Sequence, residues 1–136
     1  MKILSSKNTL LLLILSITIY GCENNSQKIV GSWKFERAYP VSDTSLDTQL
    51  LKEIKEGIKN YYKHPFTYVF YNDGTGVIKS DFEPEYFTYK IDGANIRYTD
   101  ERKKEGVFEI EKLTDDELIL SLNKQLNLSL LRVSNK

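Results

Sequence analysis

The chain has 136 residues, of which 40% are hydrophobic and 12% aromatic, enough for one modest hydrophobic core and no second one. Lysine and arginine together number 19, and so do aspartate and glutamate, so the composition provides no basic surface for nucleic-acid phosphates and excludes nucleic acid as an expected partner. The single cysteine excludes an internal disulfide, so we expect one domain that is stabilised by packing.

The N-terminal segment has the layout of a secretory signal peptide. Lys2 and Lys7 form a basic start, and an almost unbroken apolar run follows from Leu10 to Ile19. This run has about half of the roughly 20 residues that a membrane-spanning helix needs, which favours cleavage over a permanent transmembrane anchor.

The end of this segment indicates a lipid attachment site. Ile19-Tyr20-Gly21-Cys22 resembles the bacterial lipoprotein box, which implies that Cys22 receives a diacylglycerol and that a peptidase cuts just before it. We therefore predict a signal peptide at 1–21, a lipidated tether at 22–28 and a lipid-anchored protein of the cell envelope. Its membrane partner would be the outer membrane, at the periplasmic or the surface face. The alternative is an uncleaved anchor in which Cys22 has no role.

From Ile29 onward, apolar and polar residues alternate with a period of two, as in half-buried β-strands. Turn residues such as Asn72 to Gly76, Asp92-Gly93 and Thr114 to Asp116 separate the alternating stretches. The pattern predicts strands that begin near Ile29 and then cover 66–71, 77–80, 86–91, 96–98, 107–113, 118–122 and 126–130. We therefore predict an all-β domain at 29–134, a small eight-stranded antiparallel up-and-down β-barrel.

One segment departs from the strand pattern. Thr44 to Tyr62 carries apolar residues at helical spacing with charged residues between them, and Thr44 with Asp47 resembles a capping box. We predict an amphipathic helix between strands 1 and 2. It either covers an end of the barrel to complete the core or acts as a movable lid over a cavity.

Three motifs resemble the lipocalin-like domains found in lipoproteins of Bacteroidetes: Gly31-x-Trp33, Asn72 to Thr75, and Leu113 to Leu118. The similarity covers about residues 28 to 134. It implies that Trp33 packs at the closed end of the barrel against an arginine of the last strand, which would be Arg132. Gly31, Trp33 and Arg132 are then the structural signature of the domain. The first strand would run toward the open end, so the helix would lie over the mouth.

Whether side chains fill the barrel interior distinguishes two kinds of function. An eight-stranded barrel is wide enough either to be filled by side chains or to hold one small ligand, and the many inward-facing aromatic residues and leucines favour a mostly filled interior. The alternative is a pocket near the mouth, for which the predicted ligand-binding residues are Arg37, Tyr68, Phe70, Tyr89 and Tyr98. Arg37 shares the parity of Trp33 and Phe35, so it either lies inside the mouth to meet an anionic group or extends to water.

Signals for catalysis are nearly absent. His64 is the only histidine and has no neighbouring residues at metal-ligand spacing, and the acidic runs 83–85 and 115–117 lie in predicted solvated turns. We therefore expect no enzyme, no metal and no cofactor. Two functions remain: a membrane-tethered module that binds a small apolar or amphipathic ligand, or a structural lipoprotein with a filled barrel that docks an envelope protein.

Overall fold

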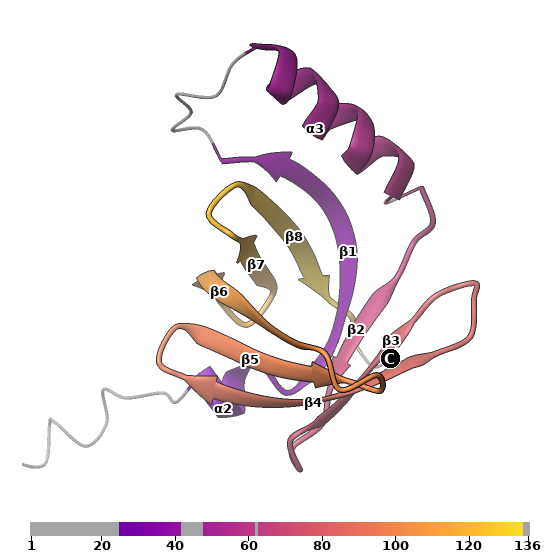
Figure 1. Ribbon diagram of the computed structural model, residues 1–136. Helices are drawn as coiled ribbons and strands as arrows, with labels where there is room; N and C mark the ends of the chain where they lie inside the picture. The colour runs from indigo at the N-terminus through magenta and orange to yellow at the C-terminus, as the bar shows by residue number, and fades with distance from the viewer. Residues whose placement is uncertain (1–24, 42–47, 62, 135–136) are drawn as a thin grey trace, which may run out of the picture.

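The computed structural model describes residues 25–41, 48–61 and 63–134, which form a closed antiparallel barrel (Figure 1). Its strands follow one another around the barrel in sequence order, and the last strand pairs with the first. This arrangement confirms the predicted eight-stranded up-and-down topology. The strands are β1 (Gly31–Pro40), β2 (Thr67–Phe70), β3 (Thr75–Lys79), β4 (Glu85–Asp92), β5 (Asn95–Asp100), β6 (Glu105–Leu113), β7 (Glu117–Leu122) and β8 (Leu126–Arg132).

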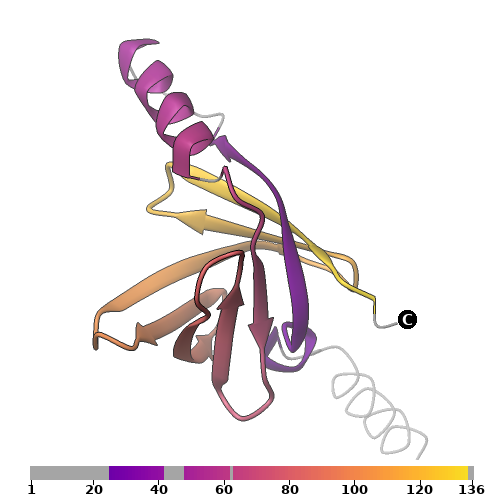
Figure 2. The same cartoon turned by 90° about the vertical axis from the view of Figure 1, so that its right-hand side faces the viewer.

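The two helices that the structure describes lie at opposite ends of the barrel (Figure 2). Helix α2 (Asn25–Lys28) contacts β4 beside the turn between β4 and β5. Helix α3 (Thr48–Tyr61) lies between β1 and β2 in the chain, as predicted, and contacts β1. The predicted capping residues Thr44 and Asp47 lie outside the described residues. Among the residues that the structure describes, no helix combines the length and the hydrophobicity required to cross a bilayer.

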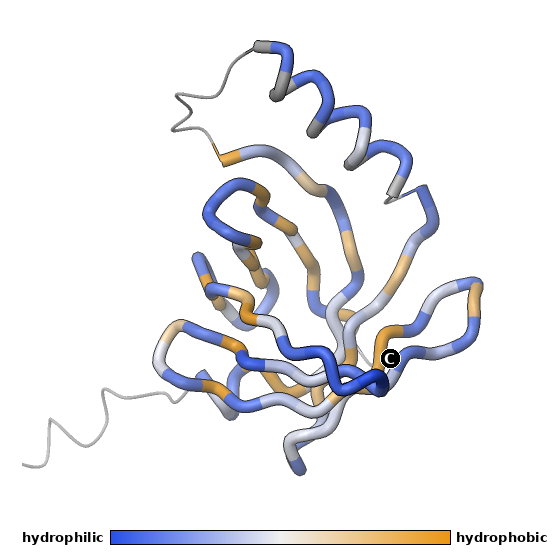
Figure 3. The backbone as a smooth tube through the Cα atoms, in the orientation of Figure 1, coloured by the Kyte–Doolittle hydropathy of each residue, from blue (hydrophilic) through white to orange (hydrophobic). Residues whose placement is uncertain are grey.

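Hydrophobic and hydrophilic residues alternate along the strands (Figure 3). Because successive side chains of a strand point to opposite faces, this alternation places one side chain in two inside the barrel. Leu118 and Leu120 of β7 face Leu128 and Leu130 of β8, and all four are at most 1% exposed. Ile96 and Phe108 pair across β5 and β6 and belong to the same core. The turn between β5 and β6 and the turn between β7 and β8 are hydrophilic (Figure 3).

Trp33 closes one end of the barrel. Its side chain is fully buried, and its Nε1–H donates a hydrogen bond to the carbonyl oxygen of Ile29 at 2.8 Å. Ile29 is also fully buried, and α2 precedes it directly. Residues 25–28 were assigned to the polar tether from sequence, but they form a helical turn because Asn25 and Ile29 are joined by a backbone hydrogen bond. Residues 25–28 are therefore part of the folded domain at its closed end.

The predicted contact between Arg132 and Trp33 is present. The guanidinium carbon lies 4.2 Å from the centroid of the indole, a geometry that adds cation–π attraction to the packing. The same guanidinium donates hydrogen bonds to three carbonyl oxygens, those of Lys28, Val30 and Asp115. Arg132 thus joins the last strand to the chain entering the first strand and to the turn between β6 and β7.

The glycine of the Gly-x-Trp motif makes room for this arginine. Gly31 has a φ of +135°, which L side chains rarely adopt. A Cβ at this position would lie 2.6 Å from Nη1 of Arg132. Any larger residue at position 31 would therefore be strained and would displace the guanidinium from the closed end.

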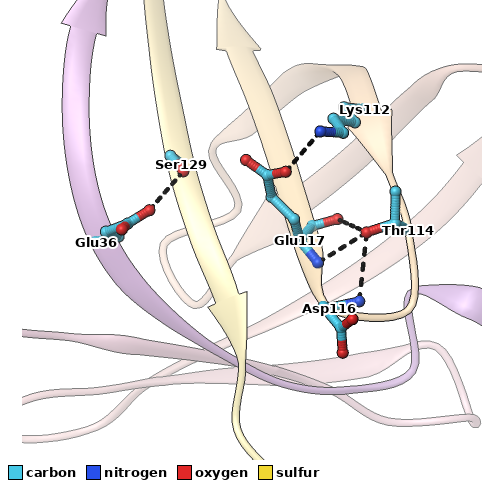
Figure 4. Close-up of polar contacts among 6 residues, drawn as sticks. All are labelled: Glu36, Lys112, Thr114, Asp116, Glu117 and Ser129. Atoms are coloured by element: carbon cyan, nitrogen blue, oxygen red, sulfur yellow. Dashed lines mark hydrogen bonds and ion pairs between the residues drawn. The ribbon is translucent and has the colours of Figure 1, made fainter.

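The pairing of β1 with β8 contains a β-bulge that changes which residues of β1 face inward. Phe35 pairs with Leu130, but Arg37 pairs with Ser129, so Glu36 is the extra residue. The buried hydroxyl of Ser129 donates a hydrogen bond to Oε2 of Glu36 at 3.1 Å (Figure 4). The bulge is therefore held by a side-chain bond between the two strands that close the barrel.

The Leu113-to-Leu118 motif forms the turn between β6 and β7. The hydroxyl oxygen of Thr114 accepts hydrogen bonds from the backbone N–H groups of Asp116 and Glu117 (Figure 4). The carboxylate of Glu117 also pairs with Lys112 at 2.7 Å across the turn. Because both charged groups are partly solvated, the ion pair contributes little to stability, and the threonine hydroxyl shapes the turn.

Candidate functional site

A cavity of about 740 Å³ occupies the open half of the barrel. Its inner wall is almost entirely apolar and its rim carries most of the polar and charged groups. The inner lining consists of Phe66, Tyr68, Phe70, Ile78, Phe87, Ile96, Tyr98, Phe108, Leu122 and Leu128, and the rim of His64, Ser80, Phe82, Glu85, Tyr86, Asp100, Glu101, Arg102 and Lys104. The expectation of a mostly filled interior is wrong for this half of the barrel.

The strand pairing explains why the cavity is open. The ladder between β1 and β2 ends at Lys34, after which one further bond joins N of Phe35 to O of Phe66, and the rest of β1 pairs only with β8. The ladder between β6 and β7 begins at Glu109, so the earlier part of β6 pairs only with β5. The hairpins β5–β6 and β7–β8 consequently diverge toward the open end (Figure 2).

Three of the five predicted ligand-binding residues line this cavity. Tyr68 and Phe70 come from β2, and Tyr98 comes from β5. Tyr98 stacks on Phe108 with 4.9 Å between the ring centroids, and Tyr68 meets the edge of Phe87 at 6.3 Å. These rings form one connected aromatic surface rather than separate anchors, and their assignment to a ligand stays a prediction.

Arg37 is not inside the mouth. The bulge at Glu36 reverses the parity of β1, so Ala38 packs on the core and Arg37 lies on the outer face, opposite Ser129. The exposed guanidinium lies 5.1 Å from the centroid of the Tyr39 ring. Of the two alternatives for Arg37, the position inside the mouth is wrong, because simple alternation does not account for the extra residue, and the side chain extends to water.

Tyr89 is buried below the cavity and does not line it. Its hydroxyl donates a hydrogen bond to the carbonyl oxygen of Tyr71 at 2.6 Å, and its ring packs edge-on against Phe70. Asp73, in the same turn, accepts hydrogen bonds from the hydroxyl and the backbone N–H of Thr75, and these bonds lower the pKa of its carboxyl. Burial, helped by the negative charge of Asp73, raises the pKa of Tyr89.

This raised pKa predicts a pH dependence for Tyr89→Phe. The folded state holds the phenolic proton of Tyr89 more tightly than the unfolded state does. The hydroxyl therefore makes its full contribution to the free energy of unfolding below the ordinary pKa of 10.0. This contribution is lost as the pH rises through the pKa of the folded state. We expect the substitution to lower the free energy of unfolding by about 1 kcal/mol at neutral pH. The difference from the unmodified protein should shrink above about pH 10.

Urea unfolding at neutral and at alkaline pH measures both effects. Tyr86→Phe is the matched control, because the Tyr86 side chain is exposed and its loss of a hydroxyl should change stability little at either pH. If the free energies of unfolding of Tyr89→Phe and the unmodified protein differed by the same amount across the alkaline range, the raised pKa of Tyr89 would be contradicted.

The rim of the cavity carries charges of both signs. Asp100 accepts hydrogen bonds from the backbone N–H groups of Arg102 and Lys104, which shape the turn between β5 and β6. His64 packs edge-on against Phe82 at 5.1 Å, and its Nδ1 lies 3.9 Å from a carboxylate oxygen of Asp81. The rim therefore favours neither an anionic nor a cationic ligand.

Sequence reasoning missed two exposed aromatic residues at the rim. The side chain of Phe82 is 66% exposed and that of Tyr86 is 54% exposed, and both border the cavity. The sequence predicts only a solvated acidic turn at 83–85. The sequence does contain a signal for these two residues. Large apolar side chains on either side of Glu83 and Glu85 are unusual for a turn that only contacts water.

Among the described residues, no group of three or more histidine, cysteine, aspartate or glutamate side chains is arranged to hold a metal ion. Cys22, the predicted lipidation site, lies outside the described residues. The chemistry that the described cavity offers is the non-covalent binding of an apolar or amphipathic molecule.

A closed up-and-down barrel with a plugged end and an aromatic-lined cavity at the other end defines a lipocalin-type β-barrel. Residues 29–120 match the sequence profile of the lipocalin-like domain, and the chain belongs to this family.

Two solved structures share the fold. One is a lipocalin-like protein from Bacteroides uniformis ATCC 8492, with a TM-score of 0.54 and 14% sequence identity, covering 79% of this chain and 99% of that chain. The other is an uncharacterized protein from Bacteroides eggerthii DSM 20697, with a TM-score of 0.52 and 14% identity, covering 76% of this chain and 98% of that chain. No curated protein matches the chain.

Proposed function

We propose that this protein is a lipid-anchored binding protein of the cell envelope that holds one small apolar or amphipathic molecule in the open half of its barrel. The observation that carries the proposal is the cavity of about 740 Å³, which lies within the roughly 300–1,000 Å³ typical of small-molecule sites. Its apolar inner wall and polar rim suit a ligand whose apolar part enters the barrel and whose polar part meets water.

The position of α2 supports an orientation for the anchored protein. The side-chain amide of Asn25 donates a hydrogen bond to the carbonyl oxygen of Gly93, in the turn between β4 and β5 at the closed end. A lipid on Cys22 would therefore be connected to the closed end by residues 22–24, which span at most about 10 Å. The cavity would then open away from the anchoring membrane, toward the aqueous compartment.

Substitution of Cys22 tests the anchor. In a bacterial host that processes lipoproteins, we expect the unmodified chain to incorporate an alkyne analogue of palmitate and to sediment with membranes. Cys22→Ala should abolish the label and release the protein, because a durable attachment needs the acyl chains. Gln27→Ala, an exposed change in α2, is the control that should keep both properties. A labelled Cys22→Ala variant would exclude the proposed site.

Native mass spectrometry of the protein from residue 22 onward tests the ligand. We expect a co-purifying small molecule that organic extraction removes.

A second candidate function is docking to an envelope protein. Leu131 and Val133 support it, since they are 43% and 42% exposed near the end of β8. A protein that carries no small molecule but co-purifies with one specific envelope protein would favour this function.

A further inference from the structure

Two glycines on the barrel wall lie directly beneath aromatic rings of the cavity. Gly76 of β3 pairs with Phe87 of β4, and Gly106 of β6 pairs with Tyr98 of β5. A Cβ on Gly106 would lie 2.2 Å from Oη and 2.3 Å from Cζ of Tyr98, and a Cβ on Gly76 would lie 2.2 Å from Cζ of Phe87. Ordinary contacts of a Cβ are 3.4–4 Å, so each ring occupies the space of the missing side chain.

The rings of Tyr98 and Phe87 line the cavity, and other aromatic rings pack against both of them. Tyr98 stacks on Phe108 with an interplanar angle of 24°. Phe87 meets the edge of Phe70 at 5.6 Å and the edge of Tyr68 at 6.3 Å. The cavity is the open space beside both rings, so a ring lifted from its glycine would move toward it.

We propose that Gly76 and Gly106 are specificity-determining residues that keep the cavity open, and that its ligand is a flat, ring-bearing apolar molecule. The inference rests on the proposed function, because it takes the cavity to be the ligand site. A side chain in place of Gly76 would push the Phe87 ring into the space proposed for the ligand. A side chain in place of Gly106 would do the same to the Tyr98 ring. Six rings line the inner wall, namely Phe66, Tyr68, Phe70, Phe87, Tyr98 and Phe108, so a planar ligand would gain stacked and edge-on contacts that a flexible acyl chain does not make.

Gly106→Ala is the informative variant. The three atoms nearest to its methyl group all belong to the far end of the Tyr98 side chain, which can move, so the variant should fold. A Cβ on Gly76 would also lie 2.8 Å from the carbonyl oxygen of Val69, so its substitution would disturb the strand itself. Gly57→Ala is the matched control, because Gly57 is exposed in α3 and a Cβ there would meet nothing within 4 Å.

Isothermal titration calorimetry with a planar probe, N-phenyl-1-naphthylamine, and an aliphatic one, 1-dodecanol, tests the proposal. We expect the unmodified protein and Gly57→Ala to bind the planar probe with equal affinity and to prefer it to dodecanol. Gly106→Ala should bind the planar probe about tenfold or more weakly, since even one misplaced methyl group in an apolar pocket changes affinity by that order. The double variant Gly106→Ala/Tyr98→Leu should recover binding, because no ring remains to be displaced.

Each outcome separates this inference from the proposed function. Binding of dodecanol in preference to the planar probe, or unchanged planar-probe affinity in a folded Gly106→Ala variant, overturns the inference and leaves the binding function standing. The absence of recovery in the double variant also overturns the role of Gly106. Binding of neither probe to the unmodified protein overturns the proposed ligand site, and the inference with it.

Discussion

Replacing Trp33 with alanine is expected to lower the free energy of unfolding by about 3–5 kcal/mol, the range for removal of a buried aromatic residue. Trp33 is fully buried between Ile29 and Arg132, and no neighbouring side chain can fill its volume without leaving its own position. The substitution would also leave the carbonyl oxygen of Ile29 without its indole donor and would deprive the guanidinium of its ring. The closed end of the barrel would therefore lose packing, a hydrogen bond and a cation–π contact together.

Urea unfolding followed by far-ultraviolet circular dichroism measures this loss, since the chain has only one tryptophan and the variant loses the fluorescent reporter. Phe82→Ala is the matched control, because it also removes a large ring but from a side chain that is 66% exposed, and it should change stability by at most about 0.5 kcal/mol. Trp33→Phe should be intermediate, since it keeps most of the ring volume and loses the donor. Equal effects of Trp33→Ala and Phe82→Ala would contradict the role assigned to the closed end.

The barrel could be predicted from sequence because its strands follow the two-residue period closely. Leu118, Leu120 and Leu122, for example, are spaced so that all three face one side, and polar turns separate the strands. The pairing of Arg132 with Trp33 could be predicted as well, since an even number of antiparallel strands returns the last strand to the end at which the first begins. These features depend on local pattern and on topology, which one sequence contains.

The site was harder to predict because it depends on departures from that pattern. The bulge at Glu36 inserts one residue into β1 and turns Arg37 outward, although the residues on both sides alternate normally. Likewise, a count of inward aromatic residues predicts a filled barrel. It does not show that Tyr98 and Phe87 lie over glycines and leave space in front of them. Register and ring position arise from contacts between distant strands, which a single sequence does not specify.

The substitution Leu122→Trp is expected to block the cavity. Leu122 ends β7 at the open end, continues the inward parity of Leu120 and borders the cavity, so the larger ring would enter the empty space. Because that space is available, the substitution should cost less than the roughly 1–3 kcal/mol of overpacking in a filled core. We expect the affinity for the co-purifying molecule, or for an apolar probe, to fall roughly tenfold or more.

Ile119→Trp is the matched control for this experiment. Ile119 lies on the same strand, but its parity is opposite to that of the inward-facing Leu118 and Leu120. Because the added ring would then project away from the cavity, this variant should bind with unchanged affinity. Leu122→Trp binding as tightly as the unmodified protein would show that the ligand lies outside the barrel. An equal loss in both variants would show that the effect comes from damage to β7. A loss confined to Leu122→Trp would locate the ligand in the open half of the barrel, because the two substitutions add the same ring to opposite faces of one strand.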